Sequence, residues 1–376
     1  MTQTISEPTE NAPDRKATWL ELFFDLIFVV AIAKASHILF HVHDNHLSSE
    51  MYLKYILVMI PIWWAWTGCT VFTNRFDCDD VLQRLMSFAQ MFCLIILAAF
   101  INTDFDSYYH GFLFSYAAIR LFTVLMYVRA SINNEQTRHV SHFLALCFGG
   151  GILISLSSLF FEGTLRYIAL YAGILFEMIM PLMAKKRLKT VPVNSHHLPE
   201  RFGLLTIILL GESILSLSNS FETISWQFSS ITMAFCSFVM VCGLWWIYFE
   251  TIDHSILGKK LGNGQSIIYS HLLIYAGLGG IAAMIRFAVI PELNLIDYKI
   301  LTAFSIFSFI FALQFLQIVY STKENRKYLL MNIILFNILF ITLLIFSPSI
   351  TVIMVGITIL ITIYVSTNYR KNLRLK

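Results

Sequence analysis

The sequence predicts an all-α protein, a polytopic transmembrane helical bundle with about 12 spans. Composition is the first reason: 57% of the 376 residues are hydrophobic, only 13% are charged, and the mean hydropathy is +0.70. A water-soluble domain usually carries about 25% charged residues, so lipid must cover much of this surface. The second reason is that apolar runs of about 20 residues, enough to cross a bilayer, recur along the whole chain.

The predicted spans are apolar runs separated by short polar segments. No small-residue cleavage site follows the first run, so we expect a retained helix and not a cleaved signal peptide. Asn194 or Ser195 is expected to cap the seventh span. The last two spans are separated only by Ser347 and Pro348, which predicts an antiparallel hairpin. The spans are predicted at residues 18–40, 52–74, 83–102, 108–129, 139–161, 165–184, 200–219, 226–250, 266–290, 300–321, 328–346 and 349–367.

Basic residues predict the orientation in the membrane. With the N-terminus in the cytoplasm, 20 of the 26 Lys and Arg residues fall in cytoplasmic segments and three fall in outer loops. This bias follows the positive-inside rule, so we expect a cytoplasmic (inner) membrane location with both termini cytoplasmic. No basic patch is interleaved with exposed aromatic residues, so no nucleic-acid partner is expected. The lipid bilayer is the predicted partner, and homo-oligomerisation stays open.

Similar motifs recur about 180 residues apart and suggest two halves. Glu21–Phe23 corresponds to Glu200–Phe202, and Trp63–Trp64 corresponds to Trp245–Trp246. A parallel repeat of six plus six helices would hold a substrate between the halves, whereas chance likeness between apolar helices is the alternative. The predicted organisation is a polar cytoplasmic tail at 1–17, transmembrane halves at 18–184 and 200–367, a basic cytoplasmic linker at 185–199, and a basic cytoplasmic tail at 368–376.

Ionisable residues within the spans are the strongest functional signal. Each costs roughly 2.5–3.5 kcal/mol at the bilayer centre on insertion scales, so packing alone does not explain them. Thr18 and Glu21 match a capping box, but Asp25, four residues further on the same helix face, has no capping role. The predicted substrate- or ion-binding residues are Glu21, Asp25, Arg120, Glu177, Arg201, Glu212 and His271.

Several of these residues also have a structural interpretation. Arg120 and Glu212 could form an ion pair that fixes helix packing. His271 could be a hydrogen-bonded core histidine. Residues 211–213, Gly-Glu-Ser, could continue a helix or unwind and line a cavity.

The sequence identifies no metal site or cofactor. His41, His43 and His46 with Asp44 in the first outer loop have the chemistry to bind Zn or Cu. No second ligand cluster accompanies them, so a solvated loop is favoured. Phosphate-binding, dinucleotide-binding and hydrolase motifs of soluble enzymes do not occur in a usable context, which favours a non-enzymatic role.

Two motifs, WLELFFDLIFVVAI at 19–32 and ERFGLLTIILLGES at 200–213, resemble the bacterial low-temperature-requirement A (LtrA) family. The stretches at 245–249 and 269–272 fit the same pattern, so the resemblance covers nearly the whole chain. It implies a bacterial integral membrane protein linked to growth in the cold, but it supplies no reaction. The last two spans match no motif. The motif residues that carry over are Glu21, Asp25, Glu200, Arg201, Glu212 and His271.

These observations leave three functional hypotheses. The favoured one is a proton- or ion-coupled secondary transporter of a small molecule or ion, with Asp25 and Glu212 as acceptors paired in one state with Arg120 or Arg201. The alternative is an intramembrane enzyme that acts on a lipid or another hydrophobic substrate, using acid–base groups that include His271. The third is a membrane sensor, for which clustered tryptophans are the only cue.

Overall fold

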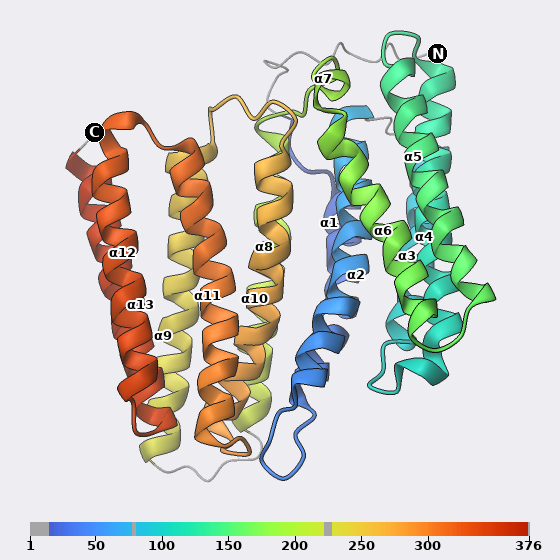
Figure 1. Ribbon diagram of the computed structural model, residues 1–376. Coiled ribbons are helices and arrows are strands. Elements are labelled where there is room, and N and C mark those ends of the chain that lie inside the picture. Colours follow the sequence, from blue (N-terminus) through green and yellow to red (C-terminus); the bar gives the residue numbers. More distant parts are fainter. Residues whose placement is uncertain (1–14, 77–79, 222–227, 375–376) are drawn as a thin grey trace. The chain divides into compact units, whose positions relative to one another are not determined.

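The computed structural model describes residues 15–76, 80–221 and 228–374, which form helices joined by short connections (Figure 1). These ranges contain no β-strand beyond an isolated bridge between His43 and His46. Twelve of the helical segments are long and apolar enough to cross a membrane. The predicted all-α bundle of about 12 spans is therefore confirmed, and most predicted boundaries lie within a few residues of the observed ones.

The helices follow one another with few interruptions. A 3₁₀ turn follows the first helix at His37–Phe40, another occupies Ser157–Phe160, and a π-helical turn occupies Ile252–Ile256. The helices are α1 (Trp19–Ser36), α2 (Ser49–Phe76), α3 (Val81–Ala99), α4 (Phe105–Asn133), α5 (Arg138–Leu156), α6 (Gly163–Met183), the short α7 (Lys185–Leu188), α8 (His197–Phe221), α9 (Phe228–Thr251), α10 (Gln265–Val289), α11 (Leu295–Tyr320), α12 (Lys323–Phe346) and α13 (Ile350–Arg374).

Side-chain caps fix where several helices begin. The carboxylate of Asp80 accepts a hydrogen bond from the backbone N–H of Gln83 at 2.9 Å and starts α3. The side-chain oxygen of Asn194 accepts a hydrogen bond from the backbone N–H of His197 at 3.0 Å. Of the two residues predicted to cap the seventh span, Asn194 is therefore the one that does so. That helix then runs unbroken from His197 to Phe221, so residues 211–213 continue the helix and do not unwind.

The chain divides into two compact units built from interleaved segments. The first comprises Met1–Lys34, Leu57–Arg201 and Lys260–Gln265, and the second comprises Ala35–Ile56, Phe202–Lys259 and Ser266–Lys376. In the first unit, α3, α4, α5 and α6 pack against one another in succession. In the second unit, α13 packs against α9 and α12, and α12 also packs against α11, so the predicted hairpin of the last two spans is confirmed. The predicted two-half division and repeat stay predictions.

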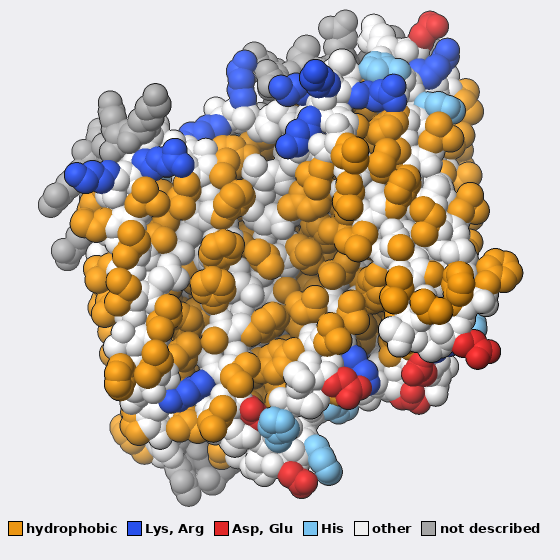
Figure 2. Space-filling model, viewed as in Figure 1, with side chains coloured by type: hydrophobic (Ala, Val, Ile, Leu, Met, Phe, Trp, Pro, Cys, Tyr) orange, Lys and Arg blue, Asp and Glu red, His pale blue; other side chains and the backbone are white. Residues whose placement is uncertain are grey.

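The distribution of side chains is that of a membrane-embedded bundle. Hydrophobic side chains cover the middle of the helices on the face shown in Figure 2, while charged side chains gather toward the helix ends. Large apolar residues such as Phe92, Leu153 and Ile345 are more than half exposed. Exposure of this much apolar surface to water would be unfavourable, whereas contact of the same surface with lipid is not. The chain is therefore a multi-pass membrane protein.

Candidate functional site

The start of α1 carries two carboxylates on one face. The carboxylate of Glu21 accepts a hydrogen bond from the backbone N–H of Thr18 at 2.8 Å, and the Thr18 hydroxyl accepts one from the N–H of Glu21 at 3.3 Å. This reciprocal pair confirms the predicted capping box. Asp25 follows one turn later and is fully buried. Capping therefore accounts for part of the role of Glu21 and for none of the role of Asp25.

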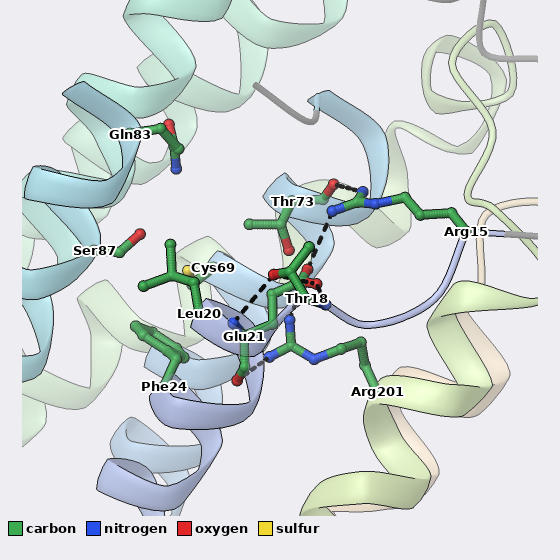
Figure 3. A pocket seen from close by; sticks show the side chains of 10 residues that line it. All are labelled: Arg15, Thr18, Leu20, Glu21, Phe24, Cys69, Thr73, Gln83, Ser87 and Arg201. Carbon is green, nitrogen blue, oxygen red and sulfur yellow. Dashed lines mark hydrogen bonds and ion pairs between the residues drawn. The ribbon is translucent and has the colours of Figure 1, made fainter. Parts of the chain in front are cut away.

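One guanidinium, that of Arg201 at the start of α8, joins both carboxylates. Its Nη1 lies 2.8 Å from Oε1 of Glu21, and its Nη2 lies 2.6 Å from Oδ1 of Asp25. Figure 3 shows the side chains of Glu21 and Arg201 pointing toward one another. Of the two partners predicted for Asp25, the structure thus selects Arg201. The three side chains are almost completely buried, so removing one member would leave another charge uncompensated.

The two oxygens of Asp25 have different surroundings. Oδ1 accepts the hydrogen bond from Arg201 and a second one from Nε1 of Trp66 at 2.8 Å. Oδ2 is buried and has no hydrogen-bond partner among the described residues. An unpaired buried carboxylate oxygen is costly unless water or a proton can reach it. Asp25 is therefore held in place through one oxygen while the other stays uncommitted.

His197, on the first turn of α8, donates to Glu21 as a neutral imidazole. Asn74 accepts a hydrogen bond from the N–H of Asn194 at 2.9 Å through Oδ1, so its Nδ2 faces Nδ1 of His197 at 3.1 Å. Nδ1 must then accept, which assigns the proton to Nε2, 3.3 Å from Oε1 of Glu21. This tautomer lets His197 bind Glu21 without adding a charge.

Arg15, which precedes α1, brings the cluster to charge balance. Its Nη1 donates to the carbonyl oxygen of Thr73 at 2.6 Å, and its Nη2 lies 3.3 Å from Oε1 of Glu21. Two guanidinium groups now face two carboxylates. We call this set the Arg201 cluster; it consists of Arg15, Glu21, Asp25, Trp66, His197 and Arg201.

A cavity of about 30 Å³ lies beside the Arg201 cluster (Figure 3). A buried water needs roughly 10–15 Å³ on this measure, so the cavity has room for about two waters and is too small for an organic substrate. Glu21 and Arg201 contribute the charged wall, and Gln83 and Ser87 of α3 lie on the other side. The remaining lining residues are Arg15, Thr18, Leu20, Phe24, Cys69 and Thr73.

A second buried ion pair joins α4 to α6. Nη2 of Arg120 lies 2.6 Å from Oε2 of Glu177, and both side chains are 0% exposed. The same oxygen accepts a hydrogen bond from Nε1 of Trp64 at 2.9 Å, and the guanidinium carbon of Arg120 lies 4.6 Å from the centre of the Phe148 ring. We call Trp64, Arg120, Phe148 and Glu177 the Arg120 cluster.

Two glycines make room for the Arg120 cluster. A Cβ atom on Gly68 would lie 2.2 Å from Nη1 of Arg120, and one on Gly151 would lie 2.1 Å from Cγ of Glu177. Gly151 is the last of three consecutive glycines, Gly149 to Gly151, in α5. Its missing side chain lets α5 approach the Glu177 side chain closely.

Glu212 does not pair with Arg120, so that predicted ion pair is wrong. Its Oε1 lies 3.5 Å from Nε2 of His37, and both of these residues belong to the second unit. Arg120 pairs with Glu177 within the first unit. The sequence of a span gives the charge of a residue and its depth in the membrane, but it does not give which helices are neighbours. Several pairings of acidic and basic residues were therefore equally compatible with the sequence.

His271 is a hydrogen-bonded core histidine. Its Nδ1 donates to the carbonyl oxygen of Ile267 at 2.7 Å, so its Nε2 accepts from the Tyr248 hydroxyl at 2.8 Å. Both side chains are fully buried. Because both ring nitrogens are engaged, His271 cannot take up a proton without breaking a bond. His271 belongs to the second unit, whereas Glu21, Asp25 and Arg201 belong to the first.

The histidine-rich loop forms a tight turn. Asp44 and Asn45 have positive φ angles of 49° and 61°, and His43 and His46 bond to each other across the turn. Nδ1 of His46 lies 2.5 Å from Oδ2 of Asp297. Among the residues that the structure describes, no group of three His, Cys, Asp or Glu could hold a metal ion.

Sequence reasoning missed most of the polar residues around the two clusters. Trp64 and Trp66, whose clustering was a cue only for a sensor, each donate to a buried carboxylate. A signal was available at Gln83, Ser87 and Gln90, because these polar residues recur every three or four positions in an apolar helix and so share one face.

Comparison with known proteins places the chain among bacterial membrane proteins of one family. The family model described as bacterial low temperature requirement A protein (LtrA) matches residues 16–365. An uncharacterized protein of Rhizobium meliloti (strain 1021) is 26% identical over 285 residues, which cover 72% of this chain and 68% of that protein. No solved structure matches the chain. The family match covers all residues of the two clusters and of the cavity lining except Arg15.

Proposed function

The chain belongs to the bacterial low temperature requirement A (LtrA) family, and from this premise we propose that it is a proton-coupled secondary transporter in which Asp25 binds the coupling proton. Membership of the family identifies no reaction or transported substrate, so the proposal rests on the Arg201 cluster. Intramembrane carboxylates paired with arginine, beside space for water, are typical of proton relays in transporters.

The observation that carries the proposal is the uncommitted oxygen of Asp25. Oδ1 is fixed by Arg201 and Trp66, while Oδ2 has no partner among the described side chains and backbone groups. A proton that passes from hydronium in the cavity, which Glu21 and Arg201 line and Asp25 does not, would bond to Oδ2. It would leave water behind and convert the carboxylate to a neutral acid. Arg201 would keep its charge and its contact with Glu21.

This protonation provides a coupling step. Neutral Asp25 attracts Arg201 less strongly, so the link between α1 and the start of α8 weakens when the proton is bound and recovers when it leaves. Glu21 is less suited to bind and release a proton, because its carboxylate oxygens already bond to Thr18, His197 and Arg201. We therefore assign proton binding to Asp25 and anchoring to Glu21.

The intramembrane-enzyme alternative has less support. It needs an acid–base pair that a hydrophobic substrate can reach, and the pair available to it, Tyr248 and His271, is fully buried with its nitrogens engaged. The cavity beside the Arg201 cluster is also too small for a lipid chain or headgroup. The size of the cavity fits a proton carried by water.

A reconstitution assay tests the proposal. The full chain is placed in liposomes of phosphatidylethanolamine and phosphatidylglycerol, with a pH-sensitive dye inside and the voltage clamped. Small organic and inorganic ions are then supplied one at a time across a pH gradient. We expect at least one solute to drive proton movement, and Asp25→Asn to abolish it.

Glu135→Gln is the matched control, because it also removes one carboxylate but lies at an exposed position. It should transport like the wild type. Solutes that move no protons through the wild-type protein, or undiminished proton movement in Asp25→Asn, would contradict the proposal.

A further inference from the structure

We infer that Glu177 is a second proton-binding carboxylate, reached from the cavity by a water path along Gln83, Ser87 and Gln90 of α3. The inference extends the proposed function to a second site, and its proton role rests on that function. The water path itself is testable without any transport assay.

The three residues form a polar row on the buried face of α3. Gln83, Ser87 and Gln90 are all at most 5% exposed, although most of the helix is apolar. Their spacing of four and three residues keeps them on one face. Gln83 and Ser87 line the cavity, and Gln90 lies roughly 10 Å further along the helix axis than Gln83, at 1.5 Å per residue.

The inner end of the row meets α4 next to Arg120. Nε2 of Gln90 donates to the Thr123 hydroxyl at 2.9 Å. Thr123 is one turn from Arg120, and both side chains face Gly68 of α2, whose missing Cβ would lie 3.6 Å from Thr123 and 2.2 Å from Arg120. The residue after Gly68 is Cys69, which lines the cavity. The cavity and the guanidinium of Arg120 therefore lie beside consecutive residues of α2.

Buried polar atoms without partners occur both in the polar row of α3 and on α4 and α6 at the Arg120–Glu177 pair. Oε1 of Gln83, Oε1 of Gln90, Nε of Arg120, Oε1 of Glu177 and the Tyr116 hydroxyl are each buried with no hydrogen-bond partner in the described part of the chain. One such atom costs about 1–3 kcal/mol, and buried polar atoms in proteins are almost always satisfied. Ordered water bonded to these atoms accounts for all five at once.

Glu177 repeats the bonding pattern of Asp25. Each carboxylate has one oxygen that is bound by an arginine and by an indole N–H from α2, and one oxygen that is uncommitted. The indoles belong to Trp64 and Trp66, two positions apart and so on different sides of α2. A proton that passes along the row would bond to Oε1 of Glu177, making a neutral acid, while Arg120 keeps its charge.

The indole protons of Trp64 and Trp66 report water access to the two carboxylates separately. The full-length protein, labelled with ¹⁵N in its tryptophan indoles and held in detergent, is diluted into D₂O, and the exchange of each indole proton is followed by NMR. Trp64→Phe and Trp66→Phe assign the two signals. We expect both protons to exchange without global unfolding, Trp66 faster than Trp64.

A substitution that blocks the water path along α3 should slow hydrogen exchange at only one of the two indoles. In Gln90→Leu we expect exchange at Trp64 to slow about tenfold or more and exchange at Trp66 to change less than about twofold. Ser87→Ala gives a second, milder block for use where Gln90→Leu lowers stability. Gln314→Leu, which removes a buried glutamine of α11 in the other unit, is the matched control and should change neither rate.

Two results would overturn the inference. One is a Trp64 exchange rate that Gln90→Leu and Ser87→Ala both leave unchanged. The other is exchange of Trp64 only through global unfolding, at the same rate as the most protected backbone amides. Neither result depends on transport, so failure of the transporter assay and failure of the water path are distinguishable.

Discussion

The Arg201 cluster and the Arg120 cluster use the same groups in different surroundings. In each, an arginine and an α2 tryptophan bind one oxygen of a buried carboxylate. The Arg201 cluster adds a second carboxylate, a neutral histidine and a neighbouring cavity. The Arg120 cluster instead has an aromatic ring on the guanidinium and glycines packed against both charges. The two sites therefore share the groups that bind the carboxylate. They differ in whether a cavity lies beside the site and in whether the arginine has a second carboxylate partner.

This difference predicts different consequences of mutation. Arg201 retains Glu21 when Asp25 is neutralised, and a cavity lies beside both residues. Arg120 has Glu177 as its carboxylate partner, and both side chains are 0% exposed. Loss of one partner should therefore affect stability most at the Arg120 cluster and function most at the Arg201 cluster.

The largest expected effect is from breaking the Arg120–Glu177 pair. Glu177→Leu leaves a buried guanidinium without a carboxylate and should lower the free energy of unfolding by about 3–5 kcal/mol. Arg120→Leu should cost a similar amount for the converse reason. The measurement is denaturant or thermal unfolding in a fixed detergent. The double variant Arg120→Leu/Glu177→Leu should lose less than the sum of the two, and strict additivity would contradict the pairing.

Asp25→Asn should cost less, about 1–3 kcal/mol, because Arg201 keeps its contact with Glu21 and the amide oxygen can still accept from Trp66. The same unfolding measurement applies, with Glu177→Gln as the isosteric counterpart in the other cluster. A loss for Asp25→Asn equal to or greater than that for Glu177→Gln would remove the distinction between the clusters.

Gly151→Ala tests the packing of the Arg120 cluster. The added methyl would meet Cγ of Glu177 at 2.1 Å, so we expect a loss of about 1–3 kcal/mol from overpacking. Gly149→Ala is the matched control, since nothing lies within 4 Å of a Cβ at that position. It should be neutral or stabilising by up to about 1 kcal/mol, as alanine favours helix. Equal effects of the two variants would contradict the close packing.

The smallest expected effect is at an exposed ion pair outside the clusters. A hydrogen bond from Arg129 holds the pKa of Asp80 below its usual value. The pair therefore stabilises the protein above the pH at which a free aspartate titrates, roughly 4, and the contribution is lost as the pH falls through the lowered pKa.

Asp80 is about half exposed, so the contribution should be below about 1 kcal/mol. Unfolding midpoints measured from neutral pH to below the ordinary aspartate pKa, roughly 4, would measure it. Asp80→Asn keeps a helix cap and removes the charge, so it should flatten that pH dependence slightly. A steeper dependence in the variant would contradict the assignment.

The sequence predicted the fold more completely than the site. Apolar run length is set by bilayer thickness, so the twelve spans and the Ser347–Pro348 hairpin could be predicted from local sequence. Local pattern also predicted the capping box of Thr18 and Glu21. Motif content singled out Asp25 and Arg201.

Partners across helices could not be predicted in this way. The pairing of Arg120 with Glu177, and not with Glu212, depends on α4 and α6 both packing against α5, which no single span records. The roles of Trp64 and Trp66 likewise depend on what faces α2 on each side. Tertiary packing decides which of several chemically equivalent pairs forms.

Infrared difference spectroscopy tests the central claim, proton uptake at Asp25, most directly. Spectra of the purified full-length protein, recorded as the pH is lowered, report each carboxylate that becomes a protonated acid. The account predicts that carbonyl bands of buried carboxylic acids appear on acidification, that the contribution of Asp25 is missing in Asp25→Asn, and that the bands persist in Glu135→Gln. Bands in Asp25→Asn that are unchanged from the wild type would show that Asp25 takes up no proton and would contradict the account.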